Sequence, residues 1–253
     1  MSKKGFHIII PARYQSSRLP GKLLMRLGEQ SVLERVYHQA LLTQPDSIVI
    51  ATDHPLIAEH ANQFADNVVM TSVDHPTGTD RLAEVISKGN YQADDIIVNV
   101  QGDEPFIEPA LINQVASSLI DPAVSIATLC WPLDNAEQLH NPNVVKVVRD
   151  RFNNALYFSR SAIPAWRDKP DCIEQVFRHI GLYAYRASFL VEFVSWPPAV
   201  LEQCEALEQL RALVAGYKIR VEQACVMPKQ DINTKMDLLI AVQTFYKSSL
   251  TVD

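Results

Sequence analysis

Glycine, paired cysteines and long apolar runs are all scarce in this chain of 253 residues. It contains 8 glycines, whereas an ordinary content of ~7% would give roughly 18, and the shortage excludes collagen-like, linker-rich and low-complexity proteins. Its four cysteines are far apart and include no C-x-x-C pair, so neither a zinc site nor a disulfide framework is indicated. We expect buried free thiols instead. No apolar run approaches the ~20 residues of a membrane span.

Targeting signals and strong charge are also lacking. The segment 1–7 leads directly into an apolar stretch that is too short for the core of a signal peptide. We therefore expect a soluble, cytoplasmic protein. The net charge of -6 and the pI near 5.6 disfavour a protein that coats nucleic acid, although a few local cations can still bind an anionic ligand.

In the first half of the sequence, short apolar runs alternate with amphipathic segments. We expect strands at 6–10, 47–51, 68–70, 96–100 and 124–130, and helices at 31–42, 55–64, 79–88 and 109–119. Ser31 and Glu34 have the spacing of a capping box, and Thr79 is a candidate N-cap. Apolar strands that are each followed by a helix predict a Rossmann-like α/β fold, with a mostly parallel central sheet covered by helices.

The second half of the sequence is less regular. We expect strands at 144–149, 155–158, 180–185 and 218–224, one amphipathic helix at 201–215 and a closing helix at 235–246. No internal repeat or linker composition is present, so we predict a single domain over 1–253. It would contain an embedded excursion at roughly 131–180 that could carry a dimer contact. In such folds the ligand lies beyond the carboxyl ends of the strands.

The loop after the first predicted strand, residues 11–22, is rich in cations and hydroxyl groups. It contains Arg13, Arg18 and Lys22, together with a Pro-Gly turn that can present the lysine. Arginine binds two phosphate oxygens at once and lysine acts as a compact charge, so this composition suits a triphosphate. The loop is not a Walker A motif, and no G-x-G-x-x-G is present. A solvated basic loop is the simpler alternative.

Two further segments follow predicted strands. Asp103 stands beside Gly102 after the most strand-like run, which is a suitable position for a Mg²⁺ ligand. The loop 75–81 enters a helix whose first backbone N–H groups can bind polar edges or anions. Both segments are also explained as ordinary turns, with Arg81 on a helix surface. Likewise, the polar residues of 201–215 are explained as a solvated helix face.

Taken together, short motifs along the chain resemble one family, that of the 3-deoxy-manno-octulosonate (KDO) cytidylyltransferases. The motifs are Pro11-Ala12-Arg13, Ser17-Arg18-Leu19-Pro20-Gly21-Lys22, Ala51-Thr52-Asp53-His54, Gly78-Thr79 with Arg81, Val98-Asn99-Val100-Gln101-Gly102-Asp103-Glu104-Pro105, Val145-Lys146-Val147-Val148, Ser159-Arg160, Arg178-His179 with Gly181 and Tyr183, and Leu207-Glu208-Gln209-Leu210-Arg211. The resemblance covers essentially the whole chain, and the combination is far more specific than any one motif.

The resemblance implies a nucleotidyltransferase that transfers CMP from CTP to the anomeric hydroxyl of KDO. The products would be CMP-KDO, for lipopolysaccharide biosynthesis, and pyrophosphate. It also implies Mg²⁺ as cofactor and a homodimer. In such a displacement, positioning, cations and metal do most of the work and no covalent intermediate is needed. The lack of a Cys–His or Ser–His arrangement agrees with this chemistry.

The resemblance also implies roles for individual residues. The catalytic set would be Arg13, Lys22 and Asp103. The nucleotide would be bound by Ala12, Arg13, Lys22, Gly78, Arg81 and Gln101. The acidic sugar, with an arginine answering its carboxylate, would be surrounded by Arg18, Gln101, Arg160, His179, Tyr183, Glu208 and Gln209. Mg²⁺ would be bound by Asp103 and Asn233.

Two alternatives stay open. One is the same reaction on a related acidic sugar, such as an amino-substituted KDO or a sialic acid, because no spacing argument separates these sugars. The other is a nucleotide-binding relative that has lost catalysis. A nucleotide-sugar glycosyltransferase is disfavoured because no D-x-D follows a strand in the first half.

Asn233 stands where the family usually has an aspartate that ligates a second metal. An amide keeps a carbonyl oxygen but lacks the negative charge, so we expect Mg²⁺ to bind more weakly at this position. The variant Asn233→Asp should therefore lower the Mg²⁺ concentration that gives half the maximal rate, measured by titrating Mg²⁺ at saturating substrates. An unchanged concentration would show that Asn233 is not a ligand.

Overall fold

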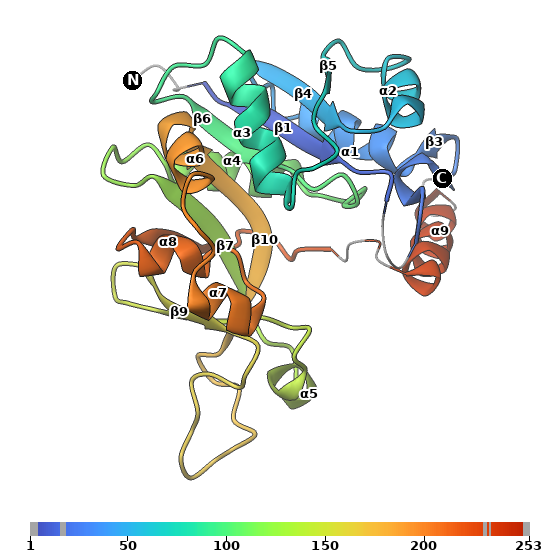
Figure 1. The fold of residues 1–253 in the computed structure, drawn as a ribbon. Helices are drawn as coiled ribbons and strands as arrows, with labels where there is room; N and C mark the ends of the chain where they lie inside the picture. The colour runs from blue at the N-terminus through green and yellow to red at the C-terminus, as the bar shows by residue number, and fades with distance from the viewer. Residues whose placement is uncertain (1–4, 16–18, 230–231, 233, 250–253) are drawn as a thin grey trace.

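In the computed structural model, residues 5–15, 19–229, 232 and 234–249 are described. They form a nine-stranded central sheet, with helices on both of its faces (Figure 1). Along the sheet the strands follow the order β11 (Ile219–Gln223), β7 (Ile126–Pro132), β10 (Phe177–Arg186), β6 (Ile96–Asn99), β1 (His7–Ala12), β4 (Ser47–Thr52) and β5 (Val68–Met70). Off this path, β8 (Lys146–Arg149) pairs with β10, and β9 (Ala155–Ser159) pairs with β8.

The predicted, mostly parallel Rossmann-like sheet is confirmed. β1 pairs in parallel with β4 and β6, β4 pairs in parallel with β5, and β7 does so with β11. The exception is β10, which lies antiparallel between β6 and β7. Because of that insertion, Tyr183 of β10 lies beside Asn99 at the carboxyl end of β6.

The helices are α1 (Val32–Leu41), α2 (Pro55–Ala61), α3 (Gly78–Lys88), α4 (Pro109–Ser117), α5 (Ala136–His140), α6 (Ala187–Phe193), α7 (Val200–Glu205), α8 (Leu210–Val214) and α9 (Lys235–Ser249). Five of the helices, α1 to α4 and α9, lie close to their expected positions. A 3-10 helix (Lys22–Leu24) and a short hairpin of β2 (Arg26–Leu27) and β3 (Gln30–Ser31) connect β1 to α1. Neither this hairpin nor α5 and α6 were predicted from the sequence.

Alternating side chains of β1 bury both faces of the sheet. Ile8 and Ile10 belong to one apolar cluster, which also includes buried residues of α1 and α4. Ile9 points to the other face and joins a second cluster with residues of α3 and α6. All three isoleucines are 0% exposed. A strand buried on both faces explains why its sequence reads as a continuous apolar run.

Three local expectations were wrong. The single helix expected at 201–215 is two short helices, because Ala206 takes the left-handed conformation (φ 50°, ψ 50°) between them. The N-cap of α3 is Thr77, which forms a capping box with Asp80, whereas the hydroxyl of Thr79 donates to Glu208. The four cysteines are free, as expected, but of these only Cys130 is buried.

The predicted excursion at roughly 131–180 contains α5 and the hairpin of β8 and β9, and it extends from one end of the sheet (Figure 1). Its role in dimer contact stays a prediction, as does the assignment of 1–253 to a single domain. Within the described residues, no helix combines the length and apolarity that a membrane crossing requires.

The capping box of α1 offers a test of the fold. Ser31 Oγ accepts the N–H of Glu34 at 3.0 Å and is also 2.8 Å from the Nε2 atom of His60. Ser31→Ala should lower the free energy of unfolding by about 1–2 kcal/mol, the usual range for a lost N-cap, as measured by urea denaturation. The control is Ser117→Ala near the end of α4, where an exposed hydroxyl donates to the carbonyl of Asn113; it should change stability little. Equal effects of the two substitutions would contradict the prediction.

Candidate active site

Three cavities lie along the carboxyl ends of β1 and β6, and Gln101 lines all of them. The first, here called the loop cavity, has a volume of about 340 Å³ and is lined by Arg13, Lys22 and Asp103. The second, the tyrosine cavity, has about 140 Å³ and is lined by Tyr183, Glu208 and Gln209. The third, the histidine cavity, has about 430 Å³ and is lined by Asp103, Arg178 and His179. The fold thus brings together residues that are far apart in the sequence.

Opposite charges meet in the loop cavity. The Nζ atom of Lys22 forms an ion pair with the carboxylate of Asp103 and donates to the carbonyl of Ile232 at 2.9 Å. Gly21 permits this placement of the lysine, because its φ of 69° lies in the left-handed region that favours glycine. Gly102 lets β6 end close to β1, since an added Cβ would stand 3.0 Å from the carbonyl of Pro11. Phosphate oxygens and a metal ion would compete for the two members of this ion pair.

Arg13 connects the loop after β1 with the loop before α3. Its guanidinium donates to the carbonyl of His75 at 2.9 Å and to that of Pro76 at 3.3 Å. Gly78, at the start of α3, lines both the loop cavity and the tyrosine cavity. Ala12, predicted to contact the nucleotide, is buried at the end of β1. Hydrogen bonds thus join the loop that carries Arg13 to the loop that leads to Gly78, and Gln101 lines the same loop cavity.

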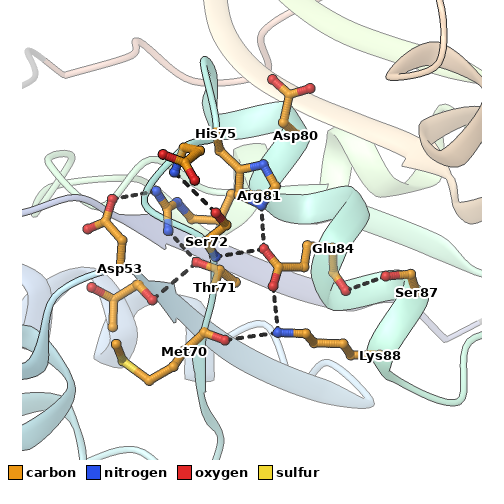
Figure 2. A network of polar contacts seen from close by, with 12 residues as sticks. Asp53, Met70, Thr71, Ser72, His75, Asp80, Arg81, Glu84, Ser87 and Lys88 are labelled. Carbon is orange, nitrogen blue, oxygen red and sulfur yellow. Dashed lines mark hydrogen bonds and ion pairs between the residues drawn. The ribbon is translucent and has the colours of Figure 1, made fainter.

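Arg81 contacts the start of the loop before α3 at Thr71 (Figure 2). Its side chain is 0% exposed, donates to Asp53 at 2.6 Å and contacts the hydroxyl of Thr71. The interpretation of Arg81 as a helix-surface residue is therefore wrong. Burial lowers its pKa, and Asp53 counteracts that effect. Since no part of the side chain is exposed, we expect Arg81 to affect a nucleotide through the loop that it holds.

Glu84 forms the second half of this network (Figure 2). Its carboxylate accepts the N–H of Ser72 at 2.8 Å, lies 2.5 Å from Nζ of Lys88 and contacts the imidazole of His75. Although burial by itself raises the pKa of Glu84, these hydrogen bonds lower it to about 2. His75 is thus held by its side chain while its carbonyl accepts from Arg13. The loop that carries Gly78 is anchored to β4, β5 and α3.

The tyrosine cavity contains buried polar atoms that have no hydrogen-bond partner among the described residues. They are Oη of Tyr183, Nε2 of Gln209 and Oδ1 of Asn99, and all three residues line this cavity. Buried polar atoms in proteins are almost always hydrogen-bonded, so unpaired ones on one cavity wall indicate a polar ligand. Burial raises the pKa of Tyr183, which keeps its hydroxyl protonated as a donor. The cavity therefore offers two donors and one acceptor.

Glu208 lies on the wall of the same cavity. It accepts hydrogen bonds from the hydroxyls of Thr77 and Thr79, each at 3.0 Å, and burial raises its pKa. The interpretation of 201–215 as a solvated helix face is wrong here, because Gln209 and Arg211 are also buried. Glu208 therefore ties the start of α3 to the segment between α7 and α8.

Arg160, predicted to contact the sugar, is engaged with backbone carbonyls. Its guanidinium donates to Glu205 at 2.6 Å, to Pro142 at 2.9 Å and to Ala206 at 3.2 Å. These bonds fasten the chain just before Glu208. Arg160 therefore positions one wall of the tyrosine cavity, and its contact with a sugar stays a prediction.

His179 and Gly181 lie on β10 and line the histidine cavity. The imidazole packs edge-on against Phe158, with ring centroids 5.1 Å apart. It also packs against Tyr183 with centroids 5.3 Å apart and the ring planes tilted by 53°. Burial lowers the pKa of His179 to about 3, so the ring is neutral near pH 7. The imidazole can therefore interact with a ligand through hydrogen bonds and not through a positive charge.

The predicted metal site can be compared with the donors present. In the part of the chain that the structure describes, no group of three or more His, Cys, Asp or Glu side chains could hold a metal by itself. Mg²⁺ bound with a nucleotide needs only one or two carboxylates, because phosphates and water supply the remaining oxygens. Asp103 beside Arg13 and Lys22 fits that requirement. Asn233 and Arg18 lie outside the described residues.

Two residues of the site were not assigned roles from the sequence. Asn99 is 4% exposed and carries one of the unpaired atoms of the tyrosine cavity. A polar residue at the end of an apolar strand was the available signal. Asp53 holds the buried Arg81, and no spacing pattern indicates that pairing because the two residues lie on different elements.

A mostly parallel sheet with a cationic loop after its first strand, an acid after the neighbouring strand and an adjoining polar cavity fits a nucleotidyltransferase. The family model described as Cytidylyltransferase matches residues 7–219. The chain is 63% identical to the 3-deoxy-manno-octulosonate cytidylyltransferase of Legionella pneumophila strain Lens, over 95% of this chain and 96% of that protein. It is 48% identical to the protein of that name from Alcanivorax borkumensis, over 92% and 95% of the two chains. The chain belongs to the cytidylyltransferase family, among the 3-deoxy-manno-octulosonate cytidylyltransferases.

Solved structures support the same assignment. CMP:2-keto-3-deoxy-manno-octonic acid synthetase, solved in complex with CTP, superposes with a TM-score of 0.89 at 37% identity and covers 96% of this chain and 99% of its own. The 4-diphosphocytidyl-2C-methyl-D-erythritol synthase of Anaerococcus prevotii reaches a TM-score of 0.65 at 12% identity, covering 96% and 100%. The second comparison shows a shared fold only.

A substitution of Asp53 tests the ion pair between Asp53 and the buried Arg81. Asp53→Asn removes the charge that compensates the buried Arg81, so the free energy of unfolding should fall by about 2–3 kcal/mol, measured by urea denaturation. The control is Lys88→Gln, which breaks the ion pair of a half-exposed lysine with Glu84 and should cost less than about 1 kcal/mol. If Asp53→Asn costs no more than the control, Asp53 does not compensate Arg81.

Proposed function

We propose that this enzyme transfers CMP from CTP to the anomeric hydroxyl of KDO, giving CMP-KDO and pyrophosphate. The proposal rests on one observation: Gln101 lines both the cationic loop cavity and the polar tyrosine cavity. The names of the relatives and the CTP complex of the related synthetase support both substrates.

In the proposed reaction, the sugar hydroxyl attacks the α-phosphate of CTP and pyrophosphate leaves. Arg13 and Lys22 lie in the loop cavity, where their charges stabilise the negative charge that grows on the phosphate oxygens. The unpaired atoms of Tyr183, Gln209 and Asn99 orient the sugar on the other side of Gln101. When both substrates are bound in one site, their reaction becomes effectively unimolecular. This proximity is a large source of rate enhancement.

Mg²⁺ is part of the proposal. When bound at Asp103, it would neutralise phosphate charge and make the α-phosphate more electrophilic. Lys22 is the residue that already balances the charge of Asp103. Asn233 is the second predicted ligand and would supply an amide carbonyl oxygen.

We also propose the setting of the reaction. The enzyme would act as a homodimer in the cytoplasm and would supply CMP-KDO for lipopolysaccharide biosynthesis. A nucleoside triphosphate substrate supports the cytoplasmic location, and the excursion around β8 and β9 is the candidate dimer contact.

The experiment that tests the proposed function measures pyrophosphate. The protein is incubated with Mg²⁺ and KDO together with CTP, UTP, ATP or GTP, one nucleotide at a time. We expect release with CTP and CMP-KDO as the second product. No release with CTP would refute the enzymatic proposal and favour the nucleotide-binding alternative. A preference for sialic acid or an amino-substituted KDO over KDO would select the related acidic sugar.

A substitution of Tyr183 tests whether the tyrosine cavity binds the sugar. Tyr183→Phe removes an unpaired donor of the tyrosine cavity, so the KM for KDO should rise about five- to tenfold while the KM for CTP changes less than about twofold. Steady-state kinetics with each substrate varied in turn measures both constants. Tyr217→Phe is the control, because its hydroxyl donates to Glu192 at 2.7 Å on the exposed surface. A KM for KDO that stays unchanged in Tyr183→Phe would contradict the assignment.

A further inference from the structure

The hydroxyl of Thr128 contacts His179 from the neighbouring strand. Thr128 belongs to β7, is 0% exposed, and its Oγ1 atom is 3.0 Å from Nε2 of His179. The same oxygen is 2.9 Å from the carbonyl of Ile180 and 2.9 Å from that of Leu182. These contacts coincide with a register shift in the pairing of β10 with β7, between Ile180 and Tyr183. Such bulges commonly re-aim a side chain next to an active site.

The position of the hydroxyl proton follows from these three neighbours. Both carbonyl oxygens can only accept hydrogen bonds, and a threonine hydroxyl has one proton to donate. If that proton went to His179, two carbonyl oxygens would face the lone pairs of Oγ1 at 2.9 Å without a proton between them. The hydroxyl of Thr128 therefore donates its proton to the carbonyl oxygens of β10. Oγ1 must then accept from His179, which requires a proton on Nε2.

We propose that Thr128 is a positioning residue that holds His179 as the Nε2–H tautomer, so that Nδ1 accepts a hydrogen bond from a hydroxyl of the substrate. The identity of that substrate as a sugar rests on the proposed function. The tautomer itself does not, since it follows from the contacts within the protein.

The surroundings of His179 agree with this assignment. Among the residues that the structure describes, none donates a hydrogen bond to Nδ1, and the ring is clamped between Phe158 and Tyr183. Burial keeps the ring neutral, as its lowered pKa indicates. A neutral imidazole with a proton on Nε2 has its lone pair on Nδ1. The charged groups that share the histidine cavity with it are Asp103, Glu104, Glu108, Arg178 and Lys229.

This tautomer decides which part of an acidic sugar can lie at His179. A carboxylate oxygen carries no proton and would face the lone pair of Nδ1, which is repulsive. A sugar hydroxyl can donate to it. The carboxylate should instead lie where donors are available, and Tyr183 and Gln209 supply two in the tyrosine cavity. Thr128 would thus contribute to the orientation of the sugar without touching it.

The first measurement needs no substrate. The full-length protein is labelled with ¹⁵N-histidine, and the ring nitrogens are observed by long-range ¹H–¹⁵N NMR, with His179 assigned by the loss of its signals in His179→Gln. We expect a protonated Nε2 and an unprotonated Nδ1 near pH 7. A protonated Nδ1, with or without a proton on Nε2, would overturn the proposal. This outcome is separate from a failure of the CTP and KDO assay.

The second measurement uses variants of Thr128. Thr128→Val keeps the shape but removes the acceptor, so the His179 signals should shift away from the pure Nε2–H pattern. The KM for KDO should rise about tenfold, with less than about twofold change in the KM for CTP. Thr128→Ser, which restores the hydroxyl, should restore both properties.

Thr43→Val is the matched control. Thr43 is also buried, and its hydroxyl donates to the carbonyl of Ala40 at 2.7 Å in a part of the fold remote from the cavities. It should lose comparable stability but leave the His179 tautomer and both KM values unchanged. If Thr128→Val behaves like Thr43→Val, Thr128 does not position His179. If Thr128→Val does not fold, the tautomer of the unmodified protein still decides the question.

Discussion

The parallel pairing of β1 with β6 is the constraint on which the site depends. Ile9 of β1 is the register partner of Asn99 in β6, so both strands end at the same edge of the sheet. The loop with Arg13 and Lys22 therefore starts beside the turn with Gln101 and Asp103. Glycine at position 102 permits that closeness, since a side chain there would press on the backbone of β1. Every cavity of the site includes a residue from this junction.

The insertion of β10 beside β6 adds the second half of the site. As an antiparallel strand, it brings His179 and Tyr183 to the edge where β6 ends. The surrounding polar network is built from buried charges: Arg81 holds one loop from inside, and Glu208 ties α3 to the chain between α7 and α8. The walls of the cavities are therefore positioned before any ligand arrives, which reduces the ordering cost of binding.

Much of this architecture could be predicted from local patterns. Apolar runs of strand length, a capping box at Ser31 and charged residues placed after strands all depend on neighbours within a few positions, and they indicated the fold and the loop cavity. The break at Ala206 could not be predicted in the same way. The sequence around Ala206 has the amphipathic pattern of one continuous helix. The left-handed residue is stabilised by contacts of Glu205 and Glu208 with distant segments, at Ser159 and Thr77.

Residue types and their order along the chain are enough to specify the α/β class, the family and the charged residues of the loop cavity, because each of these is encoded in short contiguous motifs. The burial of Arg81, the anchoring role of Arg160, the unpaired atom of Asn99 and the contact of Thr128 with His179 depend on strands and loops that meet only after folding. Burial and hydrogen-bond direction are properties of such long-range contacts. For that reason the folded chain, and not its motifs, decides which polar atoms of the tyrosine cavity remain unpaired.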